Sequence, residues 1–366
     1  MKNTFGTNIT YTLFGESHGE AIGIVIDGLP AGINVDQDFI AEQMNKRKAV
    51  GKISTQRHET DSVEIISGLF EGHTTGTPLT MLIKNTAQHS GDYQSLRYRV
   101  RPGHADYTAH VKYHGYQDYR GGGHFSGRLT APIVAAGAIA LQLLQTMGID
   151  MGTHIQQCHH IKDISFSHKE ELIKKQIKQL KQAEFPALDT TIGKDMIQFI
   201  EKTASMKDSV GGILETAVIN VPAGLGEPFF SSMESILSQL LFSIPAVKGV
   251  CFGSGAEFAN HYGSEMNDPF AYKEGVKTTT NHNGGINGGI TNGMPIRFTT
   301  IVKPTPSIYK EQNTIDLETN KDVSLTIQGR HDPAIIHRAR VVVDAVTAIG
   351  ILEALTCSQA IEPFYS

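Results

Sequence analysis

The sequence predicts a single compact α+β domain made of two related halves. Short β-branched runs bounded by turn residues alternate with helical segments along the 366-residue chain. No linker rich in proline and serine divides it. Two long helical segments each follow Gly-Arg and then proline, in GRLTAP (127–132) and GRHDPA (329–334). This internal echo predicts two pseudo-symmetric halves, each presenting an arginine before a helix N-terminus.

The predicted strands are runs of β-branched and aromatic residues that end at glycine, proline or asparagine. They cover 8–14, 22–27, 62–70, 78–85, 215–224, 249–258 and 296–302. Helical spacing of apolar residues, with candidate caps, predicts the helices. They cover 36–47, 131–147, 168–184, 231–244 and 333–355. The helix at 131–147 is apolar on all sides and is expected in the core, whereas that at 168–184 is amphipathic and solvated.

Composition excludes several classes of protein. The net charge of −5 argues against a nucleic-acid partner, so an anionic ligand would need a local basic pocket. Three well-separated cysteines form no disulfide framework, which predicts a cytoplasmic location. No apolar segment typical of a signal peptide stands at the N-terminus. The longest apolar run, Ala131–Leu144, is shorter than the roughly 20 residues of a membrane span, so no membrane partner is expected.

The segment from Arg101 to Arg128 concentrates candidate functional residues. It reads RPGHADYTAHVKYHGYQDYRGGGHFSGR and contains no Leu, Ile or Met. Such a segment lacks the apolar periodicity of a core element, so a ligand is expected to order it. Three successive glycines allow backbone N–H groups to approach an anion closely, and Ser126, Arg128 and the following helix N-terminus extend that site.

Further loops have the composition of anion sites. Residues 45–61 include five Lys or Arg in a polar loop, which indicates either a solvated face or a loop that closes over phosphates and carboxylates. GGINGG (284–289) and KPTPS (303–307) are loops of the type that bind phosphate through the backbone. GRHDP (329–333) places Arg330, His331 and Asp332 just before a helix, where a capping Asp is the plain structural alternative.

Two other chemistries are weaker alternatives. GESHG (15–19) matches the nucleophile elbow of serine hydrolases, with Ser17 as nucleophile, but a strand rather than a helix is predicted to follow it. His18 is then the reactive group and Ser17 a helper. His104, His110 and His114 have no zinc-binding spacing, so no metal is expected.

The motifs together resemble one family. GESHGEAIGIVIDGLP, RPGHAD and the segment through Arg128, VPAGLGEP, KPTPS and GRHDP are similar to the chorismate synthase family in order and spacing along the whole chain. The resemblance implies a lyase that eliminates phosphate from 5-enolpyruvylshikimate 3-phosphate, using reduced FMN without net redox change. It also implies a sandwich of antiparallel sheets around a helical core, usually as a homotetramer. The alternatives are a serine hydrolase and a flavin-binding protein without catalysis.

Roles follow from the matching positions. By resemblance, His18 protonates the leaving phosphate, His104 lies beside the flavin, and Asp332 acts with the flavin in removing the hydrogen at C6. The implied FMN contacts are His124, Phe125, Ser126, Pro245, Ala246, Gly288, Lys303, Pro304, Thr305, Pro306, Ser307 and Arg330. Substrate or NADP contacts are implied for Arg47, Lys52, Arg57, Ser17 and Arg128. NADPH, or an external flavin reductase, would supply the reduced flavin.

This chain departs from the family pattern at three places. His124-Phe125 stands where many members have Arg-Ser or Arg-Ala, so a titratable ring replaces a fixed cation. Lys52 stands where Arg is usual, which loses a two-pronged grip on an anion. Pro306 lacks the N–H that another residue would offer to the flavin.

Overall fold

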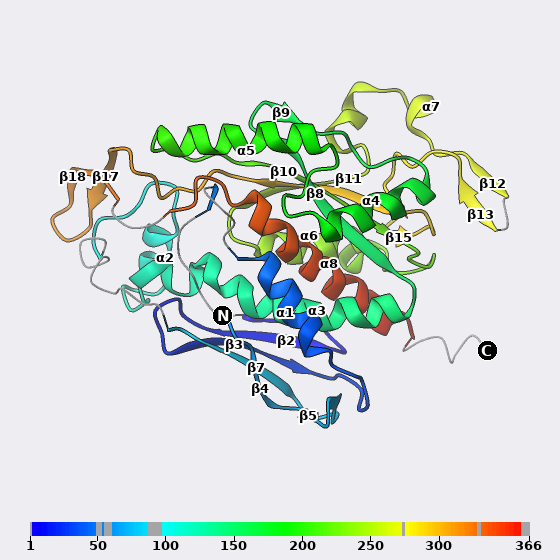
Figure 1. The fold of residues 1–366 in the computed structure, drawn as a ribbon, viewed down its shortest axis with the longest axis horizontal. Coiled ribbons are helices and arrows are strands. Elements are labelled where there is room, and N and C mark those ends of the chain that lie inside the picture. Colours follow the sequence, from blue (N-terminus) through cyan, green and yellow to red (C-terminus); the bar gives the residue numbers. More distant parts are fainter. Residues whose placement is uncertain are drawn as a thin grey trace.

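Two antiparallel sheets enclose a layer of helices, and two further helices cover the outer face of the second sheet (Figure 1). This computed structural model describes residues 2–48, 53–54, 61–86, 97–272, 275–327 and 331–359. Its main strands and helices follow the predicted α+β pattern. The antiparallel pairing throughout both sheets agrees with the predicted sandwich.

The first sheet has the strand order β1-β2-β3-β7-β4 and the second β11-β16-β10-β8-β9. The first consists of β1 (Thr4–Phe5), β2 (Thr10–Gly15), β3 (Ala21–Asp27), β7 (Leu79–Lys84) and β4 (Glu64–Ser67). The second consists of β11 (Val247–Phe252), β16 (Ile296–Val302), β10 (Gly212–Ile219), β8 (Asp150–Cys158) and β9 (Ile161–Lys162). Four short hairpins complete the described strands: β5 (Leu69–Phe70) with β6 (His73–Thr74), β12 (Phe270–Tyr272) with β13 (Val276–Thr278), β14 (Ile286–Asn287) with β15 (Ile290–Thr291), and β17 (Gln312–Asp316) with β18 (Lys321–Leu325).

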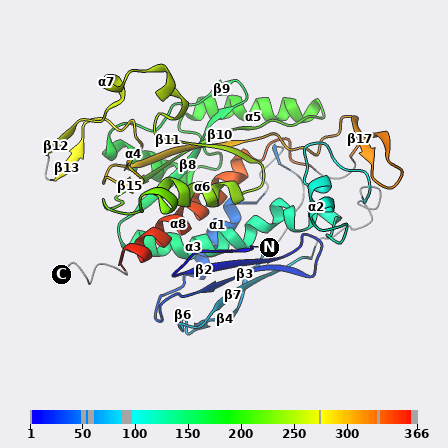
Figure 2. The same ribbon diagram turned by 180° about the vertical axis from the view of Figure 1, so that it is seen from behind.

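The helices lie in and around the layer between the sheets. They are α1 (Gln37–Lys46), α2 (Asp106–Lys112), α3 (Thr130–Thr146), α4 (Glu170–Gln182), α5 (Thr190–Ser205), α6 (Met233–Ser243), α7 (Gly263–Met266) and α8 (Ile336–Gln359). Helices α1, α3, α6 and α8 fill the space between the sheets, and α4 and α5 lie outside the second sheet (Figures 1 and 2). One hydrophobic core joins residues from both sheets and from these central helices.

The two halves repeat one arrangement, as the internal echo predicts. The first half runs β2-β3-α1-β4-β7-α3 and pairs its strands in the order β2-β3-β7-β4. The second half uses β8-β10-α6-β11-β16-α8 and pairs its strands in the corresponding order β8-β10-β16-β11. They differ mainly in the connection of the first two strands. A short turn joins β2 to β3, whereas α4 and α5 are inserted between β8 and β10.

Helices α3 and α8 pack against each other at the centre of the molecule. Gly137 makes their close approach possible, because a Cβ atom there would lie 2.3 Å from the Cβ of Ala345 and 2.6 Å from its Cα. The stretches Gly127–Thr146 and Ile336–Ser358 are long and apolar enough to cross a membrane. Their most apolar windows are 72% and 78% buried in this core, which accounts for their composition.

We expect Gly137→Ala to destabilise the protein by about 1–3 kcal/mol, the usual cost of inserting a methyl group into a packed core. The higher helix propensity of alanine offsets at most about 1 kcal/mol of this. Urea unfolding measures the difference. Gly263→Ala is the matched control, since a Cβ there meets nothing within 4 Å. Equal unfolding midpoints for wild type and Gly137→Ala would contradict the close packing.

A buried polar cluster connects the outer helical layer, α4 and α5, to the second sheet. The His154 ring on β8 lies between two carboxylates, with Nδ1 3.2 Å from Asp163 Oδ2 and Nε2 2.9 Å from Glu215 Oε2. The guanidinium of Arg297 on β16 donates to the other Glu215 oxygen at 2.5 Å. The loop that leads to α4 joins the cluster, because the N–H of Phe166 donates to Glu215 at 3.0 Å.

The structure differs from the predicted elements at several points: α2 and the hairpins β12–β13 and β17–β18 were not predicted, and three further differences have a clear physical reason. Strand β8 was not predicted, because its Thr153 and His154 are polar and are buried only through partners far away in sequence. Helix α5 was not predicted either, although Asp189 caps it by accepting from two backbone N–H groups. The strand predicted at 249–258 is wrong beyond Phe252, where glycines at positive φ lead into a short 3-10 helix.

Candidate active site

The candidate residues gather at one end of the central helical layer. Helix α3 begins there at Thr130, and its hydroxyl accepts a hydrogen bond from Arg47 Nε at the C-terminal end of α1 (3.0 Å). Helix α8 begins beside the start of β10, since the N–H of Val210 donates to the Pro333 carbonyl at 2.8 Å. Both central helices therefore direct their positive N-terminal ends to this region.

His18 belongs to the tight turn between β2 and β3. The ring is buried, and the preceding Ser17 donates its N–H to the Gly123 carbonyl at 3.1 Å. The His124 ring nitrogen Nδ1 lies 2.7 Å from the Gly15 carbonyl, so the turn is held against the glycine-rich segment at two points. Because the turn joins two antiparallel strands, Ser17 does not stand on the strand–helix turn of a nucleophile elbow.

Three consecutive glycines lie beside the rings of the two candidate histidines, His18 and His104. Gly121, Gly122 and Gly123 all have positive φ, at 60°, 85° and 54°, within the 3-10 segment Arg120–Phe125. A Cβ atom at Gly121 would lie 2.3 Å from His18 Nδ1, and one at Gly122 would lie 3.4 Å from His104 Cε1. The His18 ring thus fills the space that a side chain at Gly121 would need, whereas the His104 ring lies at van der Waals distance from a Cβ placed at Gly122.

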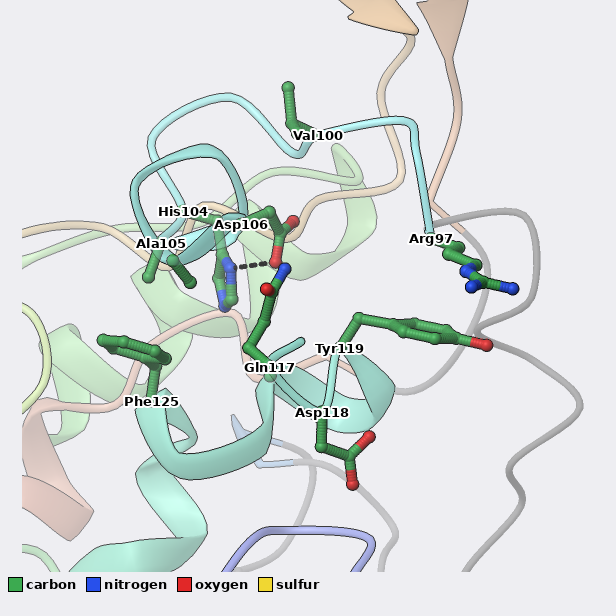
Figure 3. A pocket seen from close by; sticks show the side chains of 11 residues that line it. Arg97, Val100, His104, Ala105, Asp106, Gln117, Asp118, Tyr119 and Phe125 are labelled. Atoms are coloured by element: carbon green, nitrogen blue, oxygen red, sulfur yellow. Dashed lines mark hydrogen bonds and ion pairs between the residues drawn. The ribbon is translucent and has the colours of Figure 1, made fainter. Parts of the chain in front are cut away.

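His104 is held by an ion pair just before α2. Its Nδ1 lies 2.7 Å from Asp106 Oδ1, and Arg101 donates from Nε to Asp106 Oδ2 at 2.7 Å and from Nη2 to Oδ1 at 2.8 Å. Figure 3 shows His104 and Asp106 in the wall of a pocket, with Gln117 reaching toward them from the segment that carries Asp118 and Tyr119. Arg101 also donates to Ser307 Oγ at 3.4 Å, which joins α2 to the KPTPS loop.

The surroundings set the charge states of this group. Burial lowers the pKa of His104; the hydrogen bond to Asp106 opposes this, and the charges of Arg101 and Lys303 add to the lowering. Burial raises the pKa of Asp106, but the bonds from Arg101 and His104 outweigh it and hold the carboxyl well below its usual range. His104 is therefore neutral at neutral pH, whereas Asp106 is ionised.

The predicted flavin loops adjoin His104. The Lys303 N–H donates to the Ala246 carbonyl at 2.9 Å, and Ala246 adopts the strained left-handed conformation at φ 74°. The Lys303 ammonium group bonds the Gly103 carbonyl. Thr305 carries a buried hydroxyl with no hydrogen-bond partner among the residues that the structure describes. Pro245, Pro304 and Pro306 belong to the same two loops.

A buried arginine cluster adjoins the histidine turn. Asp61 accepts from Arg47 Nη1 at 3.1 Å and from Arg128 Nη1, while Arg128 Nε donates to Asn85 Oδ1 at 3.2 Å. The amide nitrogen of Asn85 in turn donates to the carbonyls of Glu16 and Gly19 at 3.0 and 2.9 Å. A continuous chain of contacts therefore joins the basic cluster to the turn that carries His18.

Asp332 lies at the other side of the cluster. It accepts from Arg338 Nη1 at 2.6 Å, and Arg338 Nε donates to the Arg47 carbonyl at 2.9 Å. Near Asp332, His337 Nε2 lies 2.6 Å from Ser54 Oγ. Burial lowers the pKa of His337 to about 4, so this ring adds no positive charge at neutral pH.

One predicted residue lies elsewhere in the subunit. Gly288 joins β14 to β15 beside α6, where the neighbouring Gly289 carbonyl accepts from the Met233 N–H at 2.9 Å. That position is near the Ile296 end of β16, whereas Lys303 follows its other end. Within one chain, Gly288 is thus at the opposite end of the second sheet from the other candidates. Lys52, Arg57 and Arg330 lie outside the described residues.

The structure adds residues that sequence reasoning missed. Arg101, Asp106, Asp61, Asn85 and Arg338 join the predicted residues together. Arg338 could have been found, because a cation in the first turn of a largely buried helix needs a partner. In the described ranges no group of three His, Cys, Asp or Glu could hold a metal ion.

Two histidines beside a glycine turn, backed by buried arginines on an α+β scaffold, define an enzyme site suited to a multiply anionic substrate. Comparison with known proteins supports this class of enzyme. The family model described as chorismate synthase matches residues 9–356. Proteins named chorismate synthase from Pyrococcus abyssi and Thermococcus gammatolerans are 44% and 45% identical over 352 and 359 residues, covering 96% and 98% of both chains.

A solved structure agrees as well. The crystal structure titled "Crystal Structure of Chorismate Synthase" has a TM-score of 0.76 and 26% identity, and the alignment covers 96% of this chain and 92% of that one. The chain belongs to the chorismate synthase family. It is a carbon–oxygen lyase that eliminates phosphate from 5-enolpyruvylshikimate 3-phosphate to form chorismate in the shikimate pathway. Neither the hydrolase alternative nor the non-catalytic alternative gains support.

Proposed function

We propose that this site performs the elimination with reduced FMN, using His18, His104 and Asp332. The observation that carries the proposal is the approach of His18 and His104 to consecutive glycines, next to the buried arginine cluster. General acid–base groups and anion-binding groups are thereby gathered at one end of the helical layer. Both are needed to expel phosphate from a substrate with two carboxylates.

The basic cluster is suited to hold the substrate. Arg47, Arg128 and Arg338 face two carboxylates, Asp61 and Asp332, so positive charge is in excess among the described side chains of the cluster. Burial strengthens the attraction of these guanidinium groups for an anion because water screens them less. The planar forks can bind carboxylate or phosphate through two hydrogen bonds. Lys52 and Arg57, on the basic loop, are proposed to complete this binding.

The residues around the KPTPS loop fit a flavin. The buried Thr305 hydroxyl lacks a partner among the described residues, and a flavin ring carries polar edge atoms that could bond it. Ala246 holds a strained backbone conformation beside Lys303, as is common where a loop is shaped for a ligand. His124, Phe125, Ser126 and Arg330, with the loops at 245–246 and 303–307, are the proposed contacts. Gly288 could join them only from a second copy of the chain.

Proton positions then follow from the side chains. His18 would donate a proton to the departing phosphate oxygen, in a buried turn from which bulk water is excluded. Asp332, oriented by Arg338, would assist the removal of the C6 hydrogen. When bound, reduced flavin supplies electron density to the breaking C–O bond and recovers it, which explains the absence of net redox change. The protein contributes orientation and electrostatics.

The assembly and the supply of reduced flavin are also proposals. A homotetramer, a cytoplasmic location and an external flavin reductase follow from the family resemblance, with NADPH as the alternative source of electrons.

The direct test is an anaerobic assay. The enzyme, 5-enolpyruvylshikimate 3-phosphate and photoreduced FMN should release chorismate and inorganic phosphate in equal amounts, whereas oxidised FMN should give neither. Repeating the assay with NADPH and oxidised FMN, with and without an added flavin reductase, identifies the electron source. Equal rates with oxidised and reduced FMN would contradict the proposed cofactor.

A further inference from the structure

Asn85 directly follows β7, and its side chain meets the turn that carries His18. The amide nitrogen Nδ2 donates to the Glu16 carbonyl at 3.0 Å and to the Gly19 carbonyl at 2.9 Å. The amide oxygen Oδ1 accepts from Arg128 Nε at 3.2 Å. Carbonyls only accept and a guanidinium only donates, so exchanging the amide oxygen and nitrogen would break all three bonds. The partners therefore define one orientation of this side chain.

The two carbonyls that Asn85 bonds are the two ends of one β-turn. The Gly19 N–H donates to the Glu16 carbonyl at 3.0 Å, which closes the turn with Ser17 and His18 at its central positions. Both central residues are buried, yet they belong to neither β2 nor β3. The hydrogen bonds of the sheet therefore do not place them, and their position depends on the groups that hold the turn.

Two groups hold this turn from outside the β2–β3 hairpin. The first is the glycine segment, because the Ser17 N–H donates to the Gly123 carbonyl at 3.1 Å. The second is Asn85, whose backbone N–H also donates to the Glu20 carbonyl at 3.1 Å, next to the ladder between β7 and β3. Asn85 thus bonds three carbonyls of the segment 16–20 from a backbone that the first sheet keeps in place.

The amide of Asn85 also joins the turn to the buried arginine cluster. Arg128, which donates to the amide oxygen, donates to Asp61 as well, and Asp61 accepts from Arg47 Nη1 at 3.1 Å. One side chain therefore sets the place of His18 relative to guanidinium groups suited to bind an anion. A misplacement of about 1 Å between reacting groups commonly costs about a hundredfold in rate.

We propose that Asn85 is a positioning residue for His18: it bonds both ends of the turn and, through Arg128, fixes the turn against the basic cluster. This inference rests on the proposed function, in which His18 protonates the departing phosphate and the basic cluster holds the substrate. Asn85 acts through the turn and takes no part in the proton transfer.

Removing the amide should slow the chemical step more than it weakens substrate binding. With reduced FMN bound, we expect Asn85→Ala to lower kcat by about tenfold to a hundredfold. The KM for 5-enolpyruvylshikimate 3-phosphate should change by less than about threefold, because Arg128 keeps its bond to Asp61. A raised KM with an unchanged kcat would make Asn85 a substrate-binding support and would overturn the proposal.

Asn85→Asp separates the turn from the arginine. The carboxylate still accepts from Arg128, but it offers no donor to the two carbonyls of the turn. We expect kcat to be at least as low as in Asn85→Ala, and a wild-type kcat would overturn the proposal. Asn220→Asp is the matched control: the Asn220 amide donates to the Gly148 carbonyl at 2.7 Å beyond the far end of β10, so kcat should change less than about twofold.

Coupling to His18 distinguishes a positioning role from a general loss of structure. In the His18→Ala background, Asn85→Ala should change kcat by less than about twofold, because the group that it positions is already absent. Equal losses of kcat in the two backgrounds would overturn the proposal. If His18→Ala alone has no effect, the proposed acid is wrong instead, and the role of Asn85 in holding the turn is judged by hydrogen exchange.

That role can be measured without substrate or flavin. Hydrogen–deuterium exchange of a peptide that includes residues 16–20, followed by mass spectrometry, should be faster in Asn85→Ala and Asn85→Asp than in the wild type. Asn220→Asp should exchange this peptide at the wild-type rate. If one Asn85 variant fails to fold, the other gives the same comparison. Wild-type exchange in a folded Asn85 variant would overturn the positioning role.

Discussion

We expect His18→Ala to lower kcat by about 10²–10⁴, the usual effect of losing a general acid. The departing phosphate oxygen would then leave without a proton from the protein. The ring is buried in the turn between β2 and β3 and lies against Gly121, so bulk water does not occupy this position in the wild type. Single-turnover measurements under anaerobic conditions, with reduced FMN already bound, report the chemical step itself.

Two comparisons test whether the loss reflects the proton donor. His73→Ala removes an exposed histidine from a hairpin remote from the turn and should change kcat less than twofold, as for surface substitutions generally. Added imidazole should partly restore turnover to His18→Ala, because the variant leaves a ring-sized space beside Gly121. Undiminished turnover in His18→Ala would exclude the residue as the acid.

We expect His154→Gln to destabilise the protein by about 3–5 kcal/mol at neutral pH, the typical cost of removing one partner from a buried ion pair. Its ring lies between Asp163 and Glu215, both ring nitrogens face carboxylate oxygens, and the only further cation of this cluster in the described chain is Arg297. Glutamine would leave two buried carboxylates facing one guanidinium. Urea unfolding measures the loss, with His73→Gln as the exposed control.

The pH dependence of this loss follows from the pKa shifts. Burial opposes protonation of His154, but the hydrogen bonds to Asp163 and Glu215 outweigh it and raise its pKa. Its contribution is therefore complete below the ordinary histidine pKa and is lost as pH rises through the raised folded value. The difference in unfolding free energy between wild type and His154→Gln should thus shrink at alkaline pH. A difference that grows there would contradict the imidazolium assignment.

The carboxylates of the same cluster determine the pH below which the cluster stops stabilising the fold. Burial raises the pKa of Asp163 and of Glu215, but in each case the hydrogen bond with His154 and the other bonds and charges reverse the shift, so both values are lowered. Their contribution is present above the ordinary carboxyl values and disappears as pH falls through the lowered folded ones. The cluster therefore stabilises the fold most between these two limits.

Periodicity and composition predicted the elements whose own residues are enough to show that they are buried. Helix α3 is apolar on every side, so its place in the core follows from its own residues. Strand β8 is different, because Thr153 and His154 are buried only when Thr216, Asp163 and Glu215 are folded around them. No local pattern contains those partners, which explains why the strand was missed.

The candidate site likewise contains residues that the sequence identified and residues that only the structure shows. His18, His104 and Asp332 stand in recognisable motifs, and the family resemblance implies their roles without knowledge of their contacts. Arg101 and Asp106 stand in the RPGHAD motif too, yet only the structure shows that they form a bidentate ion pair beside the His104 ring. Asn85 and Asp61 carried no signal, because their importance lies in linking a turn to a basic cluster through tertiary contacts.

The unequal connections of the two halves place the turn that carries His18 in the first half alone. A strictly symmetric molecule would carry the β2–β3 turn twice, and both copies would meet the N-terminal ends of the central helices. Here the equivalent connection, between β8 and β10, contains the outer helices α4 and α5. The second half therefore has an outer helical layer at the place where the first half has the turn that carries His18.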